Sequence, residues 1–271
     1  LIGLLNLHSA GASAAGDPPY LKQIRWIALG LVLMFAVICV DYRLIIRWAY
    51  LIHGIAIFLL VIVYLYGTVT HGSQRWINLA GFSFQPSELV KLTLVLSLAR
   101  YFNDHKQPEA FTLRGLFIPI LMVLIPFGMI VRQPDLGSAL LLLILFGSIA
   151  LFVGVRWRSL FLVASTGLLL APFVWNFLHD YQRERVLTFF DPGRDPLGSG
   201  YHIIQSIIAV GSGMFFGKGY MRGTQSQLKF LPEQQTDFVF SVFAEEWGFL
   251  GVLILLILYL AFILWGLKIA Q

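Results

Sequence analysis

Asp237 stands where a polar segment enters a long apolar run of the chain. With Thr236 before it and apolar residues after it, Asp237 is typical of the start of a helix. A carboxylate at such a boundary can cap the helix, serve as a general base or help to hold a divalent metal ion. No other acid in the sequence is better placed, so Asp237 is the predicted catalytic residue and the candidate metal ligand.

Two further acids, Glu245 and Glu246, lie about two to three turns inside the same apolar run. Ionisable groups at that depth are costly in lipid, so they normally face protein, water or a partner. We therefore expect neither glutamate to face lipid.

Glu88 and Lys91 are three residues apart in a segment that Pro86 opens as a helix start. This spacing places both charges on one helical face, where they can pair. Two interpretations are equally supported: a structural pair that neutralises two buried charges, and a functional pair.

Asp135 follows Pro134 at another predicted helix start, close to Arg132. For Asp135 alone, the sequence favours a helix-capping role over catalysis. Both residues nevertheless belong with the candidate site, because of where the topology places them.

The composition indicates that membrane-spanning helices must position these residues. Of the 271 residues, 58% are hydrophobic and 12% are charged, with a mean hydropathy of +0.79; soluble domains carry about 25% charged residues. The net charge of +5 is typical of the basic loops that orient a membrane protein, and we expect no nucleic-acid partner. The sequence therefore predicts an all-α, polytopic transmembrane helix bundle.

A spanning helix needs about 20 apolar residues, and about seven segments fit that description. They are Leu21–Val40, Ile46–Tyr66, Pro86–Tyr101, Leu113–Val131, Leu136–Val155, Leu160–Leu178 and Asp237–Leu267. Leu1–His8 resembles the tail of one more helix. Residues 1–271 are thus predicted to form a single membrane-embedded domain, with one long extracytoplasmic loop over about 179–236.

The basic residues of the short loops predict which side of the membrane each loop faces. One alternating set of short loops holds most of the arginines and lysines found in short loops, which places this set on the cytoplasmic side. The opposite loops carry Arg75, Arg132 and Asp135, and Asp237 ends the long segment on the same side. We therefore expect these four residues, together with Gln85, near the outer face.

Sequence motifs for organic cofactors are missing, since no Walker loop, Rossmann fingerprint or Cys/His metal cluster is present. A divalent cation, Mg²⁺ or Mn²⁺, is the one cofactor that Asp237 suggests. Gly211–Gly219 resembles a phosphate-cradling loop in composition alone, and a flexible extracellular turn is the favoured interpretation.

Five segments, in order, closely resemble the SEDS family (shape, elongation, division and sporulation). They are Gly-Ser-Gln-Arg-Trp at 72–76, Gln-Pro-Ser-Glu-Leu-Val-Lys at 85–91, Gln-Pro-Asp-Leu-Gly at 133–137, and longer runs at 195–206 and 223–240. The resemblance covers essentially the whole chain and is strongest to the elongation branch. Members have ten spanning helices, so the last two are expected to be missing here.

The resemblance implies a peptidoglycan glycosyltransferase of the bacterial cytoplasmic membrane that polymerises lipid II for cell elongation and rod shape. Its active site would face the extracytoplasmic side. A class B penicillin-binding protein, which is a transpeptidase, is the implied partner, beside lipid II and membrane lipids.

The resemblance also implies roles for individual residues. Asp237 matches the essential loop acid, and Glu88 and Lys91 match a functional pair in a central cavity, with Arg75 and Asp135 around it. Positive charge for the departing diphosphate would come from three side chains: Arg75, Lys91 or Arg132.

Two other functions stay open at this point. A lipid II flippase would also suit the charges of Glu88 and Lys91, although the candidate groups cluster at one face and no inverted repeat is visible. A non-catalytic scaffold for a transpeptidase is the third. Substitution of Asp237 separates them, because an enzyme needs this acid and a pure scaffold does not.

Overall fold

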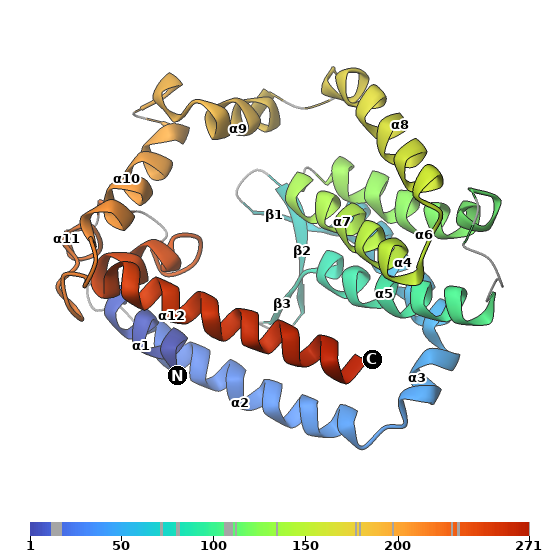
Figure 1. Ribbon diagram of the computed structural model, residues 1–271, viewed down its shortest axis with the longest axis horizontal. Helices are drawn as coiled ribbons and strands as arrows, with labels where there is room; N and C mark the ends of the chain where they lie inside the picture. Colours follow the sequence, from blue (N-terminus) through green and yellow to red (C-terminus); the bar gives the residue numbers. More distant parts are fainter. Residues whose placement is uncertain are drawn as a thin grey trace. The chain divides into compact units, whose positions relative to one another are not determined.

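The computed structural model describes residues 1–11, 18–70, 73–79, 82–105, 111, 113–133, 135–176, 178, 180–196, 198–228, 230–231 and 234–270. The chain divides into two compact units: one consists of Leu1–Val37 with Glu184–Gln271, and the other is Ile38–Arg183. Figure 1 labels the helices and strands of both units.

In the described part of the chain, five helices are long and apolar enough to cross a membrane. They are α2 (Pro19–Ile38), α4 (Ala49–Tyr66), α6 (Leu113–Arg132), α7 (Leu136–Val153) and α12 (Val239–Ala270). Each overlaps a predicted span. Where the sequence predicts a span over Leu160–Leu178, helix α8 (Trp157–Trp175) holds a shorter apolar stretch, Trp157–Leu169. The predicted polytopic helical membrane protein is confirmed.

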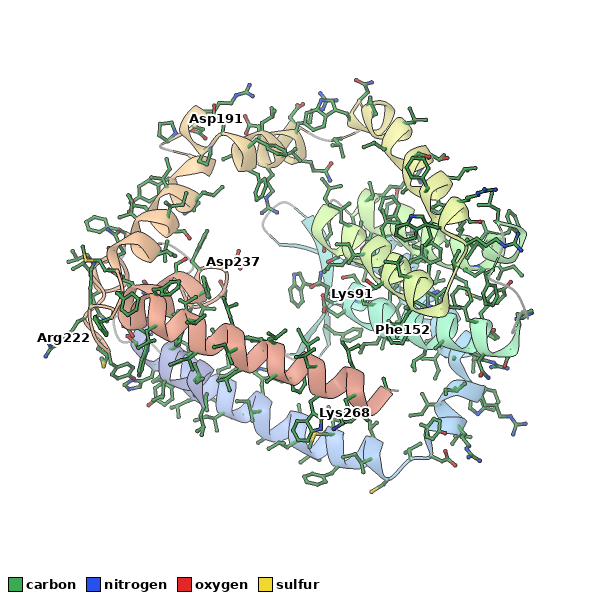
Figure 2. All side chains as sticks on the ribbon, in the orientation of Figure 1. Lys91, Phe152, Asp191, Arg222, Asp237 and Lys268 are labelled. Atoms are coloured by element: carbon green, nitrogen blue, oxygen red, sulfur yellow. The ribbon has the colours of Figure 1, made fainter. Side chains whose placement is uncertain are left out.

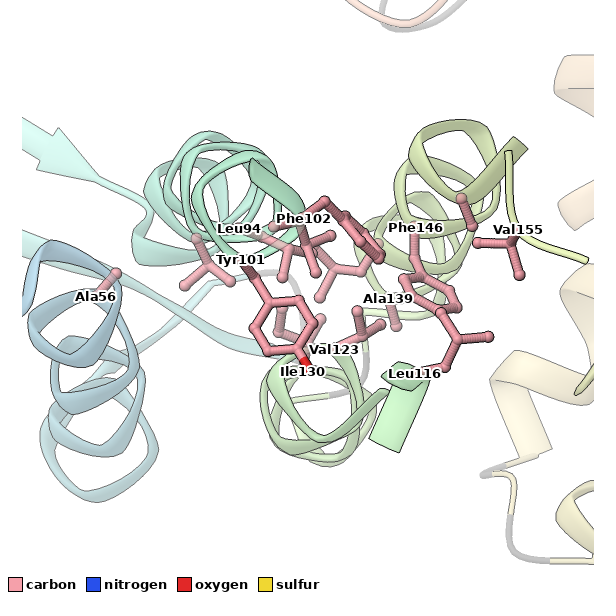
Figure 3. Close-up of a cluster of buried hydrophobic side chains, with 14 of the residues drawn as sticks. Ala56, Leu94, Tyr101, Phe102, Leu116, Val123, Ile130, Ala139, Phe146 and Val155 are labelled. Atoms are coloured by element: carbon pink, nitrogen blue, oxygen red, sulfur yellow. The ribbon is translucent and has the colours of Figure 1, made fainter. Parts of the chain in front are cut away.

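In the unit Ile38–Arg183, four helices pack around a shared apolar core: α4, α5 (Pro86–Asp104), α6 and α7. Figure 3 shows side chains of this core meeting between the helices, among them Ala56, Leu94, Ile130 and Phe146. Because lipid tails are as apolar as these side chains, close van der Waals packing is what holds such helices together.

Helix α5 is the least apolar of the four, yet it contacts all three others. Its buried residues recur every three or four positions and include Val90, Leu94, Ser97 and Tyr101. The hydroxyl of Thr93 is hydrogen-bonded to His53 Nδ1 at 3.0 Å, and Ser97 donates to the carbonyl of Ala49 at 3.1 Å. The neighbouring helix α4 thus satisfies polar groups of the predicted span Pro86–Tyr101.

A small three-stranded sheet precedes α5 and adds a minor β element that the sequence does not predict. Strands β1 (Thr68–Thr70), β2 (Ser73–Leu79) and β3 (Phe82–Phe84) pair antiparallel in the order β1–β2–β3. Two of the strands have three residues, which is too short for an alternating pattern to be recognised. Contacts of β2 with α4 and α5 fix the sheet against the helices.

The short helix α3 (Tyr42–Arg47) is capped by Asp41, whose side chain accepts from the Arg43 amide. Arg100 of α5 donates to the carbonyls at the other end of α3, those of Ile46 at 3.3 Å and of Arg47. A cation suits a helix carboxyl terminus, where the backbone dipole is negative.

Much of the predicted loop over 179–236 is helical in the structure. It contains α9 (Asp180–Phe190), a 3-10 turn η1 (Pro192–Arg194), α10 (Ser199–Ser212) and α11 (Thr224–Gln227). Helix α10 packs against α12, where the hydroxyls of Ser206 and Ser241 are 2.7 Å apart, and α1 (Ile2–Ala10) also contacts α12. Glycine- and proline-rich turns separate these short helices and give the sequence its loop-like composition.

Helix α12 is interrupted at Gly248, whose backbone angles (φ 63°, ψ −166°) are not helical. The turn Gly213–Gly219 supplies backbone partners on both sides of the break. The pairs are Lys218 N to Glu245 O, Gly219 N to Glu246 O, Phe249 N to Met214 O and Leu250 N to Phe215 O, at 2.8–3.1 Å. Backbone groups freed by the break are thus paired with a second segment, as buried groups require. The turn expected to be flexible is an ordered part of this unit.

Candidate functional site

Asp237 lies in the turn Gln234–Phe238, which leads directly into α12 (Figure 2). Because α12 begins at Val239, the helix start predicted at Thr236 and Asp237 is wrong by two residues. The side chain of Asp237 is exposed, which a general base needs in order to reach a substrate. The structure therefore presents an accessible carboxylate just before the amino terminus of α12.

Contacts with α1 fix both ends of this turn. Gln234 donates to the carbonyl of Ala10 at 2.9 Å, and Asn6 donates to the carbonyl of Val239 at 2.7 Å. A small buried cluster supports the turn and consists of Ala10, Leu231 and Val242, with Phe238 packed against it. Asp237 is thus held on a backbone that is ordered before any substrate binds, which favours catalysis.

Glu245 is fully buried inside α12 and accepts several hydrogen bonds. Its Oε1 accepts from Lys218 Nζ at 2.7 Å, from Thr224 Oγ1 at 3.1 Å and from the Gln225 amide at 3.1 Å. Its Oε2 lies so close to Gly223 that a Cβ there would stand 2.7 Å away. As expected, this glutamate faces protein and not lipid.

Glu246 is buried beside it and joins α1 to the same region. Its Oε1 accepts from the Ser9 hydroxyl and, at 3.1 Å, from the Met221 amide. The neighbouring Tyr220 hydroxyl donates to the carbonyl of Leu5 at 3.3 Å. Partial burial raises the pKa of Tyr220, and the charge of Glu246 raises it further.

Sequence reasoning did not find the partners of these two glutamates. Lys218 precedes Glu245 by 27 residues, and Ser9 precedes Glu246 by 237. A charge deep in an apolar run signals that a partner exists, but one sequence does not say which residue it is.

Glu88 and Lys91 form the predicted ion pair on α5, with Nζ and Oε1 2.7 Å apart. The side chains are 57% and 20% exposed, respectively, so Lys91 is largely covered in this unit and Glu88 is not. Lys91 is labelled at the start of α5 in Figure 2.

Asp135 caps α7, as the sequence favours. Its carboxylate accepts from the amide of Ser138 at 3.2 Å and from the Ser138 hydroxyl at 2.8 Å. Gln85, just before α5, also donates to it at 3.2 Å. The carboxylate therefore ties the starts of α5 and α7 together.

The remaining candidates of this unit lie near the same helix ends. Arg132 is exposed in the last turn of α6, three residues before Asp135. Arg75 lies in β2, which contacts α5, and its side chain is outside the described part of the chain. Within this unit the structure thus brings Glu88 to Lys91 and joins Gln85 to Asp135, while Asp237 belongs to the other unit.

A resident metal site is not formed by the residues that the structure describes, since no group of three or more His, Cys, Asp or Glu side chains among them could hold an ion. Asp237 offers one carboxylate. Mg²⁺ is commonly bound by one or two carboxylates together with substrate phosphates and water. A divalent cation here would therefore depend on the substrate for its other ligands.

Helices of membrane-spanning length, with an accessible carboxylate at the mouth of one of them, define a polytopic membrane protein with a candidate acid–base site. Residues 2–271 match the family of FtsW, RodA and SpoVE, described as cell cycle proteins. The chain belongs to this family, which confirms the predicted SEDS membership.

Two relatives illustrate the match. MrdB of Escherichia coli K12, named a peptidoglycan glycosyltransferase, is 45% identical over 251 residues, which are 92% of this chain and 67% of that protein. RodA of Treponema pallidum, which carries the same enzyme name, is 34% identical over 343 residues, covering 99% of this chain and 79% of that protein.

Solved structures share the fold. A chain of a peptidoglycan synthase complex, described for its structural coordination of polymerization and crosslinking, superposes with a TM-score of 0.76 at 36% identity, covering 95% of this chain and 71% of that chain. The rod shape determining protein RodA of Thermus thermophilus gives a TM-score of 0.63 at 31% identity, with 95% and 67% covered.

Proposed function

We propose that this chain polymerises lipid II into β-1,4-linked glycan strands for cell elongation and rod shape. Its enzyme class is that of a peptidoglycan glycosyltransferase, the name carried by relatives up to 45% identical. The enzyme class predicted from the sequence is thus confirmed. The structural observation that carries the proposal is the exposed Asp237 on a turn that α1 holds at both ends.

Asp237 is the proposed general base. Its carboxylate takes the proton of the acceptor 4-hydroxyl while that oxygen forms a bond to the anomeric carbon of the donor sugar. The bond between the anomeric carbon and the lipid diphosphate breaks, and the diphosphate leaves with that electron pair. In-line attack by one acceptor converts an α-linked donor into a β-linked product, so no covalent enzyme intermediate is required.

Besides a general base, the reaction requires positive charge near the leaving group, because that group is a diphosphate. We assign this task to Arg75, Lys91 and Arg132, with Glu88 orienting Lys91 through the 2.7 Å ion pair. In the alternative role of Asp237, as a metal ligand instead of the base, a divalent cation held by Asp237 and the diphosphate would neutralise further negative charge on the leaving group.

The chain is a multi-pass membrane protein. We place its active site on the extracytoplasmic side of the bacterial cytoplasmic membrane, because the loops that carry fewer basic residues lead to the candidate residues. A class B penicillin-binding protein is the proposed partner, supported by the structural neighbour in a complex that coordinates polymerization and crosslinking.

The test is lipid II polymerisation by the full-length protein purified with its transpeptidase, comparing wild type with Asp237→Ala and Asp237→Asn. Both variants should lose glycan synthesis while the complex stays intact. Asp191→Asn is the matched control, because Asp191 is an exposed acid of the same unit outside the turn (Figure 2). Normal polymerisation by the Asp237 variants would remove Asp237 from the mechanism.

A further inference from the structure

The stretch Leu228–Phe238, which carries Asp237, connects two helices, α11 and α12, that are joined by a single carboxylate, that of Glu245. On one side it follows α11, whose Thr224 and Gln225 both donate to Glu245 Oε1 at 3.1 Å. On the other side it runs into α12, to which Glu245 itself belongs. Hydrogen bonds to one buried side chain therefore hold α11 against α12, the two helices that this stretch connects.

Lys218 completes this arrangement. Its Nζ donates to Glu245 Oε1 and to Thr224 Oγ1, at 2.7 Å each, and its backbone amide donates to the carbonyl of Glu245 at 3.0 Å. A buried carboxylate needs a compensating charge to be tolerated. Lys218 supplies this charge, and its hydrogen bond to Thr224 also fixes the first residue of α11.

We infer that Glu245 is a positioning residue for Asp237, with Lys218 as its charge partner; this inference rests on the proposed role of Asp237. Fixing both ends of a loop removes conformational freedom that would otherwise have to be lost on binding substrate. A reacting group displaced by about 1 Å can cost about a hundredfold in rate. Glu245 is buried, so it acts on the rate through the placement of Asp237 and not by touching substrate.

The main variant replaces the pair as a unit, Lys218→Met with Glu245→Met, which removes both charges and leaves neither uncompensated. We expect kcat for lipid II polymerisation to fall about tenfold to a hundredfold with KM unchanged, because ground-state binding is not altered. Hydrogen–deuterium exchange should become faster at the amides of Gln225 and Gln234–Phe238. The full-length complex with its transpeptidase is used throughout.

Three further variants sharpen the test. Thr224→Val removes a hydroxyl that bonds Glu245, on a residue that is exposed as a whole, so it should fold normally and show a smaller effect of the same kind. Lys218→Arg keeps the charge and should keep most of the activity. Arg222→Met is the matched control, because Arg222 is a cation of the same loop whose side chain points outward and is exposed (Figure 2); exchange and kcat should stay at wild-type values.

The outcomes distinguish this inference from the proposed function. If Asp237→Asn is inactive while the pair variant and Thr224→Val keep wild-type kcat or wild-type exchange, the positioning role is overturned and the proposed function stands. If the pair variant only unfolds at lower temperature and its folded fraction keeps full kcat, the pair is merely structural and the inference also fails. If Asp237→Asn remains active, the proposed function fails and the inference falls with it.

Discussion

Gly217 and Gly248 approach each other so closely that a Cβ on Gly248 would overlap the backbone nitrogen of Gly217. Both have positive φ angles, 79° and 63°, a region that side chains rarely tolerate. This contact lies where the Gly213–Gly219 turn enters the break in α12. The break therefore depends on glycine at both positions, and it separates the short segment that follows Asp237 from the long apolar remainder of the helix.

Gly248→Ala should lower the free energy of unfolding by about 3 kcal/mol or more, because these backbone angles alone cost about 1–3 kcal/mol for a residue with a side chain and the overlap adds to that cost. Gly266→Ala is the control, since Gly266 lies in the same helix with open space around it and should change stability by less than about 1 kcal/mol. Denaturant titration in detergent measures both. Equal effects of the two substitutions would contradict the structural role of the break.

Breaking the Glu88–Lys91 pair should affect activity far more than stability. Half-exposed ion pairs contribute about 0–1 kcal/mol, and Glu88 is 57% exposed. Lys91→Met should therefore unfold almost as wild type does, yet slow polymerisation by about a hundredfold, the usual scale for losing a charge-stabilising donor. Thermal unfolding and lipid II polymerisation on the same preparation separate the two effects.

A matched control exists on the same helix. Asp104 pairs with Arg100 at 3.3 Å and is 45% exposed, so Asp104→Asn breaks a comparable pair at the opposite end of α5. It should keep full polymerisation activity. A similar loss in Asp104→Asn and Lys91→Met would mean that charge pairs on α5 act through helix stability and not through the substrate.

Most of the helical scaffold was predictable, because long apolar runs have few folds available to them in a membrane. The predicted Leu136–Val155 corresponds to α7 at Leu136–Val153, and the capping role favoured for Asp135 follows from a short-range signal that the sequence carries in full. The Glu88–Lys91 contact was predictable for the same reason, since helix geometry fixes which residues three apart are neighbours.

What was not predictable depends on contacts between distant segments. The run Glu245–Gly251 is typical of an uninterrupted helix, and its break at Gly248 is visible once the turn Gly213–Gly219 is placed against it. Lys218 looks like an ordinary loop cation until it lies beside Glu245. The exposure of Glu88 likewise follows from which helices surround α5 and not from the residues near it in sequence.

Asp135→Ala should lower the free energy of unfolding by about 1 kcal/mol, the usual cost of losing a helix cap. The side chains of Ser138 and Gln85 also lose the carboxylate that accepts their hydrogen bonds. Asp135→Asn keeps an oxygen that can accept from the Ser138 amide and should restore most of that stability. Denaturant titration measures the free energy of unfolding of the wild type, Asp135→Asn and Asp135→Ala, which should decrease in that order. If Asp135→Asn is as unstable as Asp135→Ala, the charge and not the cap is what α7 requires.

Chelation of divalent cations should abolish polymerisation without destabilising the protein. Among the described residues no cluster of three ligands is available, and Asp237 supplies a single exposed carboxylate, so the proposed cation would bind tightly when the substrate diphosphate completes its coordination. EDTA should therefore stop glycan synthesis, and excess Mg²⁺ or Mn²⁺ should restore it, while the unfolding temperature of the substrate-free protein is the same with and without EDTA. Glycan synthesis that continues in EDTA would leave Asp237 as a base that works without a metal. A drop in unfolding temperature on chelation would instead show a resident ion held by the protein alone, contrary to the substrate-dependent binding expected from one carboxylate.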